Sequence, residues 1–141
     1  MATFLCKTEP DDYSYDDLVR DKRTEWDGVS NNAAQMHMRT IAKGDEVLIY
    51  HTGNEKRIAG LATVTKGAYP DPENPGELAS GEPKFVLFDV KPTKAAGNTC
   101  TLADVKADDR FADFALVKQA RLSVMPVPAK LDKLLRTMAG L

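Results

Sequence analysis

The sequence contains few of the residues that build metal centres and disulfide frameworks. Its 141 residues include two cysteines, Cys6 and Cys100, and two histidines, His37 and His51. The cysteines form no CxxC pair and the histidines form no HExxH motif. We therefore expect no disulfide framework, no metal site and no cofactor.

Long apolar runs are also absent. No segment approaches the roughly 20 apolar residues that span a bilayer. Residues 1–15 lack the basic region and apolar stretch of a secretion signal. Together with the unpaired cysteines, these absences favour a cytoplasmic protein with no membrane partner.

Positive charge is not in excess. The chain has 19 lysines and arginines against 21 acidic residues, which gives a net charge of −2 and an isoelectric point near 5.7. A protein of this charge does not hold nucleic acid by bulk attraction to phosphates. If nucleic acid is the ligand, the basic residues must gather on one face and a pocket must supply much of the discrimination.

The composition is otherwise that of an ordinary folded domain. Hydrophobic residues make up 43% of the chain and charged residues 28%, as in most globular proteins. A chain of this length buries roughly two-thirds of the surface that it exposes when unfolded. We expect one domain, residues 1–141, that acts as a monomer.

Short apolar runs bounded by turn residues predict the strands. They fall at residues 2–7, 46–51, 58–66, 84–90 and 121–127, with a short extended segment at 26–29. Residues 67–83 contain several prolines and glycines and predict a long irregular loop, and loops of this length are usually functional or disordered.

Helices are predicted by capping residues and by apolar spacing. Ser14 with Asp17, and Thr101 with Asp104, resemble capping boxes. Asn31 or Asn32 caps a helix in which Ala34, Met38 and Ile41 share one face, and residues 129–138 form a closing helix. The elements do not alternate strictly, so we predict an α+β fold: a mixed, partly closed β-barrel of five to six strands with flanking short helices.

The only tryptophan, Trp26, is followed by Gly28 and by two amides, Asn31 and Asn32. A tryptophan is a wide apolar plate that stacks on flat ligands, and asparagines beside it can read the hydrogen-bonding edge of a planar group. The stretch therefore suits a pocket for a nucleobase or a similar ring. A lone tryptophan in a small domain is also a common core residue, and both interpretations stand at this point.

Signals for catalysis are weak. Cys6 lies in the apolar run Phe4-Leu5-Cys6, which predicts a buried structural thiol rather than a nucleophile beside His51. There is no GxSxG elbow, and no carboxylate pair is marked out among the acidic residues. The polar linker after His51 lacks phosphate-loop spacing, and it is either a solvated turn or a loop that touches a phosphate with Lys56 or Arg57.

The order of several short motifs resembles that of the EVE domain family. The resemblance extends from about Phe4 to Val127, and each motif is short while the ordered combination is specific. The motifs are Lys7-Thr8-Glu9-Pro10, Tyr13-Ser14-Tyr15-Asp16-Asp17-Leu18, Trp26-Asp27-Gly28-Val29, Gly44-Asp45, Tyr50-His51-Thr52, Gly60 with Val64, Tyr69-Pro70-Asp71, and Arg121-Leu122-Ser123-Val124 with Pro126-Val127.

The resemblance implies a PUA-like fold, related to the YTH readers of methylated RNA. It also implies a non-catalytic module that binds a modified base, methylated or hydroxymethylated, flipped out of DNA or RNA into an aromatic pocket. Carried over by similarity, the base-binding residues are Trp26 as the stacking wall, Thr8, Asn31 and Tyr50 as edge contacts, His51 and Thr52 close by, and Tyr69 in a loop lid. The candidates for phosphate contact are Lys7, Arg39, Lys56 and Arg121.

The chain departs from the family pattern after the tryptophan. The family often reads GVRNxQARN, whereas this chain has Ser30 and Ala33 where the arginine and the glutamine stand. If those side chains touch phosphate or base, this chain binds more weakly or prefers another modification. Gln35, one helical turn away, is a candidate to replace the lost amide.

Two other functions remain open from the sequence. The first is a binder or an enzyme that acts on a free nucleoside, nucleotide or other small planar ligand, which the acidic charge favours. The second is an interaction module whose proline-rich and glycine-rich loop docks a protein partner. The sequence does not choose between DNA and RNA.

Overall fold

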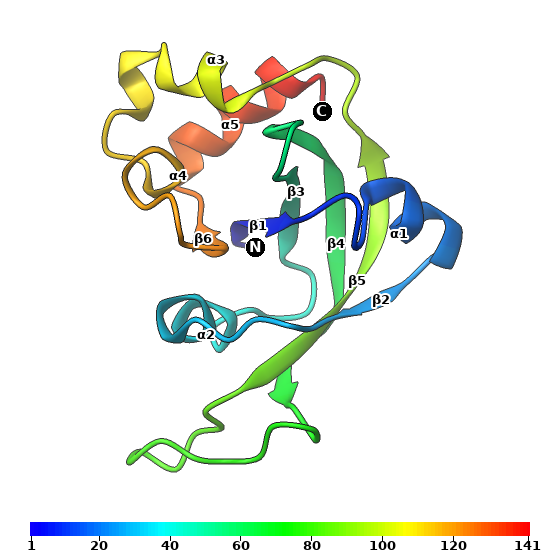
Figure 1. Ribbon diagram of the computed structural model, residues 1–141, viewed down its shortest axis with the longest axis vertical. Helices are drawn as coiled ribbons and strands as arrows, with labels where there is room; N and C mark the ends of the chain where they lie inside the picture. The colour runs from blue at the N-terminus through cyan, green and yellow to red at the C-terminus, as the bar shows by residue number, and fades with distance from the viewer.

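The computed structural model describes residues 1–141 and contains one six-stranded sheet with short helices around it (Figure 1). The strands are β1 (Thr3–Thr8), β2 (Thr24–Trp26), β3 (Glu46–His51), β4 (Arg57–Pro70), β5 (Val86–Ala95) and β6 (Val124–Pro126). The helices are α1 (Tyr15–Asp21), α2 (Asn32–Met38), α3 (Leu102–Lys106), α4 (Ala115–Lys118) and α5 (Ala129–Ala139), with a 3₁₀ turn at Asp109–Phe111.

The strand order is β2-β5-β4-β3-β1-β6. Only β1 and β3 are parallel, and every other pair is antiparallel. The two edge strands, β2 and β6, have three residues each and do not pair with one another. The predicted α+β fold, a mixed and partly closed barrel with flanking helices, is therefore confirmed.

Capping signals placed two helices correctly because they act locally. The Ser14 hydroxyl accepts from the Asp17 N–H at 3.0 Å, and the Asp17 carboxylate accepts from the Ser14 N–H at 2.9 Å. Thr101 and Asp104 form the same reciprocal pair before α3. Asn31, rather than Asn32, is the N-cap of α2.

Several boundaries differ from those predicted. Helix α2 ends at Met38, although Ile41 is still buried in the turn that follows. Strand β4 continues to Pro70, so the irregular loop begins at residue 71 and projects from the body at the lower end of Figure 1. Strand β6 is limited to three residues because β1 pairs with it only along Phe4–Cys6. The 3₁₀ turn and α4 were not predicted, since neither has a run long enough to show apolar periodicity.

One hydrophobic cluster of 32 buried residues lies against the sheet. Helices α3, α4 and α5 gather near β1, β3 and β6, and α1 lies near β4 and β5 (Figure 1). Among the largest fully buried side chains are Phe88, Phe111, Leu5, Leu18 and Met38. No helix is long and apolar enough to cross a membrane.

Tyr15, the first residue of α1, anchors this helix to the sheet. Its hydroxyl donates to the Leu61 carbonyl at 2.7 Å, and its ring lies over Gly60 in β4. A Cβ atom at position 60 would lie 2.5 Å from the Tyr15 ring. The glycine is therefore required by the close approach of the ring, and the ring fixes the helix that leads the chain into β2.

Replacing Gly60 tests this packing. Gly60→Ala is expected to lower the free energy of unfolding by about 1–3 kcal/mol, because an added methyl overpacks a filled site. Urea denaturation measures the loss. Tyr15→Leu removes the ring, so the double variant should lose clearly less than the sum of the two single variants. Additive losses would show that Tyr15 is not what confines Gly60.

Candidate functional site

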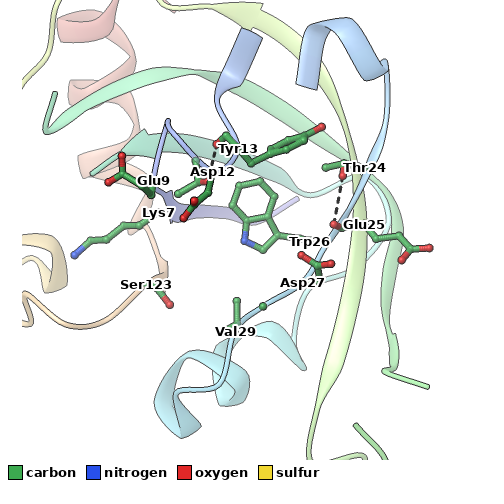
Figure 2. Close-up of a pocket in the computed structure, with 12 residues that line it drawn as sticks. Lys7, Glu9, Asp12, Tyr13, Thr24, Glu25, Trp26, Asp27, Val29 and Ser123 are labelled. Atoms are coloured by element: carbon green, nitrogen blue, oxygen red, sulfur yellow. Dashed lines mark hydrogen bonds between the residues drawn. The ribbon is translucent and has the colours of Figure 1, made fainter. Parts of the chain in front are cut away.

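A cavity of about 510 Å³ lies where the sheet fails to close (Figure 2). Its lining comes from both sides of the gap. On one side are the end of β1 and the loop after it, residues 7–9 and 12–13, together with Ser123 before β6. On the other side are the edge strand β2 and the segment that follows it, residues 24–29. We call this cavity the Trp26 pocket.

Trp26 is both a core residue and a wall of the pocket. Its side chain is 7% exposed, and the indole stacks on Phe88 of β5 with ring centroids 6.2 Å apart and an angle of 22° between planes. Figure 2 shows the indole between Tyr13 and Val29, with its ring nitrogen on the side where Ser123 lies. The indole N–H donates no hydrogen bond to another group of the protein. The two interpretations of Trp26 are thus compatible.

Carboxylates dominate the charge of the Trp26 pocket. Four acidic residues line it, Glu9, Asp12, Glu25 and Asp27, against one cation, Lys7. The Lys7 ammonium donates to the Ala120 carbonyl at 3.0 Å. The pocket therefore offers hydrogen-bond acceptors to a ligand and disfavours a phosphate inside it.

The segment after Trp26 forms the rim and presents free backbone groups. The N–H groups of Gly28, Val29 and Ser30 donate to no backbone acceptor. Gly28 has a φ of 72°, in the left-handed region that glycine adopts without strain. The rim therefore brings unpaired amide donors close to the indole.

Gln35 fixes the rim in place. Its side chain is 3% exposed, its Nε2 donates to the Val29 carbonyl at 2.8 Å, and its Oε1 accepts from the Val86 N–H at 2.9 Å. A single buried amide thus ties the rim to strand β5. Gln35 is not a lining residue of the Trp26 pocket, so its role here is to position the rim.

Replacing Gln35 should destabilise the protein. Gln35→Met keeps the volume but leaves the Val29 carbonyl and the Val86 N–H without partners, at an expected cost of about 2 kcal/mol or more in the free energy of unfolding. Chemical denaturation measures this cost. Met36→Ala, at the exposed neighbouring position on α2, is the matched control and should change stability by less than about 0.5 kcal/mol. Equal effects of the two variants would contradict the role assigned to Gln35.

Among the predicted base-binding residues, the structure brings Trp26 and Thr8 together in the Trp26 pocket, beside Lys7. The Thr8 hydroxyl donates to the Tyr13 carbonyl at 2.7 Å, which holds the loop between β1 and α1. The hydroxyl oxygen also retains lone pairs for a ligand donor.

The other predicted base contacts lie outside the Trp26 pocket. Asn31 is exposed and its side-chain oxygen accepts from the Ala34 N–H at 2.9 Å, so the cap uses this acceptor. Tyr50 and Thr52 line a neighbouring cavity. The Tyr69 hydroxyl donates to the Asp89 carboxylate at 2.5 Å, and burial together with this carboxylate raises the pKa of Tyr69.

His51 is buried and both of its ring nitrogens are occupied. Nε2 accepts from the Tyr15 N–H at 2.9 Å, and Nδ1 lies 2.9 Å from a Glu55 carboxylate oxygen. Because a backbone N–H can donate only to a lone pair, Nε2 is unprotonated and Nδ1 carries the proton. The contact holds the pKa of Glu55 below its usual range. The His51 side chain therefore links the start of α1 to the end of β3.

The predicted phosphate contacts are distributed over the surface. Lys7 and Lys56 line the neighbouring cavity. Arg39 donates to the Lys84 carbonyl at 3.0 Å, and Arg121 lies in a shallow hollow together with Asn31 and Ala33. Lys7 and Lys56 therefore share a cavity that neither Arg39 nor Arg121 lines.

Sequence reasoning missed the other residues of the pocket, namely Glu9, Asp12, Tyr13, Thr24, Glu25, Asp27, Gly28, Val29 and Ser123. Some of them stand inside the motifs quoted above, directly after Trp26 or before β6. Adjacency to the tryptophan was the available signal for Asp27 and Gly28. Asp12 lies in the loop that follows Thr8, and Ser123 lies beside Lys7, whose N–H donates to the Ser123 carbonyl at 2.8 Å. The signal for Ser123 is thus the pairing of β6 with β1, which neighbouring residues in the sequence do not reveal.

Cys6 does not have the environment of a nucleophile. Its side chain is fully buried, and burial raises the pKa of its thiol. In the β1–β3 pairing it stands opposite Ile49, whereas His51 stands opposite Thr8. The prediction of a buried structural thiol is confirmed.

Comparisons with known proteins give a consistent relationship. A model of the family described as EVE domain matches residues 2–138. Human thymocyte nuclear protein 1 is 28% identical across 88% of this chain, and the match covers 68% of the human protein. A Rhodopseudomonas palustris protein solved by NMR is 42% identical, with a TM-score of 0.87 and coverage of 99% of this chain and 94% of that chain.

A further solved structure carries a ligand. It is the crystal structure of human THYN1 protein in complex with 5-methylcytosine-containing DNA, and it is 25% identical to this chain. Its TM-score is 0.88, with coverage of 100% of this chain and 99% of that chain.

Proposed function

This chain belongs to the EVE domain family, and from that membership we propose that it is a non-catalytic module that binds a modified base of DNA in the Trp26 pocket. The observation that carries the proposal is a cavity of about 510 Å³ walled by a tryptophan that is packed from behind. The similarity to human THYN1, which was crystallised with 5-methylcytosine-containing DNA, supports DNA as the polymer.

A base within a duplex cannot reach such a pocket, so the target nucleotide must be flipped out. Extruding a base costs a few kcal/mol, and stacking on an aromatic side chain returns about 1–3 kcal/mol. Trp26 supplies this plate without moving, because Phe88 already supports its other face. Hydrogen bonds to the edge of the base must supply the remaining free energy.

The acceptors of the Trp26 pocket favour bases that carry an exocyclic amino group. Carboxylates such as Asp12 and Asp27 can accept from the amino group of cytosine or adenine. The free N–H groups of Gly28 and Val29 can donate to a ring nitrogen or carbonyl of the same base. This chemistry supports methylated or hydroxymethylated cytosine first and methylated adenine second, over thymine or uracil.

The methyl group alone gives limited selectivity. Burying one methyl contributes roughly 1 kcal/mol or somewhat more, which corresponds to about five- to tenfold in affinity. Sharper discrimination needs a polar contact that the unmodified base does not satisfy. We therefore expect a preference of about five- to tenfold for the modified base from apolar contact alone.

The acidic lining also favours a second function, the binding of a free nucleoside or another small planar ligand. Four carboxylates around the indole repel phosphate groups, which a free nucleoside lacks. The two functions differ in one measurable property. A polynucleotide ligand gives a salt-dependent affinity, whereas a neutral nucleoside does not.

Binding to a matched panel tests the proposal. DNA and RNA oligonucleotides of one sequence would carry a single cytosine, 5-methylcytosine, 5-hydroxymethylcytosine, adenine or N6-methyladenine, alongside the free nucleosides. Trp26→Phe keeps an aromatic ring on Phe88 but shortens the stacking plate, so we expect affinity for the preferred oligonucleotide to fall by about tenfold. Phe114→Leu, a buried aromatic outside the pocket, controls for loss of stability and should leave affinity unchanged.

The outcomes separate the two functions. A modified oligonucleotide that binds clearly better than its plain counterpart, with the preference reduced in Trp26→Phe alone, supports the base-binding module. Equal affinity for nucleoside and oligonucleotide at every salt concentration supports the small-ligand function. If no ligand discriminates and both variants match the wild type, the Trp26 pocket is not a base site.

A further inference from the structure

A second cavity, of about 340 Å³, lies next to the Trp26 pocket. It is bordered by the ends of the parallel strands β1 and β3, by the loop after β3, and by α3 and α4. Lys7 is the one residue that lines both cavities. We call it the lysine pocket.

The charge of the lysine pocket is opposite to that of its neighbour. Three lysines line it, Lys7, Lys56 and Lys106, and no acidic residue does. None of the three forms a salt bridge. The Lys7 ammonium has only the Ala120 carbonyl and the face of the Tyr50 ring, 5.9 Å from the ring centroid, as partners. One carboxylate lies beside the lining: Glu9 accepts from the Thr52 hydroxyl at 3.2 Å and lies against Gly53.

Tyr50 adds an unpartnered polar group to this pocket. Its side chain is 3% exposed, yet its phenol oxygen makes no hydrogen bond in the protein. A buried hydroxyl without a partner is unfavourable, so such groups are normally paired with protein, water or ligand. The oxygen is not among the enclosed polar atoms that lack a partner, so it is open to water or to a ligand.

The backbone of the loop after β3 supplies a further donor. The Gly53 N–H donates to no backbone acceptor, and Gly53 has a φ of 70°. The Lys56 carbonyl accepts from the Leu102 N–H at 2.7 Å, which ties this loop to the start of α3. Ammonium groups, a phenol and a backbone amide therefore border one cavity, and each of them can donate a hydrogen bond.

We propose that the lysine pocket binds a phosphate of the DNA backbone, next to the nucleotide whose base occupies the Trp26 pocket. A tetrahedral anion with several acceptor oxygens matches this set of donors better than a planar neutral group. The proposal rests on the proposed function, since it places base and phosphate of one strand on either side of Lys7.

This arrangement accounts for how an acidic protein can hold a polyanion. The net charge is −2 and the Trp26 pocket repels phosphate, so attraction must come from a local group of cations. The lysine pocket provides that group directly beside the base site. Base and backbone would then be recognised by adjacent cavities of opposite charge.

Paired substitutions test the proposal. Lys56→Gln with Lys106→Gln removes two cations from the lysine pocket, and Lys130→Gln with Lys133→Gln removes two exposed cations from α5 as a matched control. Affinity for the modified and the unmodified DNA duplex would be measured from 50 to 300 mM salt. Release of one phosphate contact should make the slope of log K against log salt shallower by about 0.9.

The expected result has three parts. The double variant of the lysine pocket binds both duplexes with an affinity lowered by the same factor, so the ratio of the two affinities stays unchanged. Its slope of log K against log salt is shallower than that of the wild type. The α5 pair changes neither. Tyr50→Phe, which alters no charge, lowers the affinity for both duplexes by about fivefold because one hydrogen bond is lost.

Other results would overturn the proposal. An unchanged slope, or an equal change in the α5 pair, excludes a phosphate contact in the lysine pocket. Titration with inorganic phosphate, followed by the NMR signals of the Tyr50 ring, distinguishes a free anion from the DNA backbone. Binding of inorganic phosphate without any change in the DNA slope assigns the pocket to a free anion instead. A reduced slope without base preference would retain the phosphate site and reject the Trp26 pocket as a base site.

Discussion

The open edge of the sheet is the constraint on which the functional part of this protein depends. The edge strands β2 and β6 have three residues each and do not pair with one another, so the curled sheet leaves a gap between them. Residues far apart in the sequence meet there, Trp26 from one edge and Thr8 and Ser123 from the other side. Because Phe88 packs against the indole from behind, the only tryptophan completes the core and still borders a cavity.

The parallel pairing of β1 and β3 places the second cavity beside the first. Parallel strands end at the same edge of a sheet, so Lys7 and Tyr50 stand opposite one another and the loops that follow them are neighbours. The loop after β1 borders the acidic cavity, and the loop after β3 borders the cavity with three lysines. The separation of charge between the two cavities thus follows from the register of one strand pair.

Local signals in the sequence predicted local structure well, as with the capping boxes at Ser14 and Thr101. The site was predicted only where a residue lies on the Trp26 strand or in the motif that ends β1. Asn31 and His51 lie outside the pocket, where a helix cap uses the acceptor of one and two hydrogen bonds occupy the ring of the other. Ser123 reaches the pocket because β6 pairs with β1, and a pairing between segments so far apart in the sequence is not encoded by neighbouring residues.

The most direct measurement uses Trp26 as its own reporter, since it is the only tryptophan in the chain. Its fluorescence would be followed while DNA carrying one 5-methylcytosine is added, with the unmodified duplex as the control. A base that stacks on the indole should quench the emission to saturation, at about five- to tenfold lower concentration for the modified duplex. An emission that does not change, or that changes identically with both duplexes, would contradict the assignment of a modified base to this pocket.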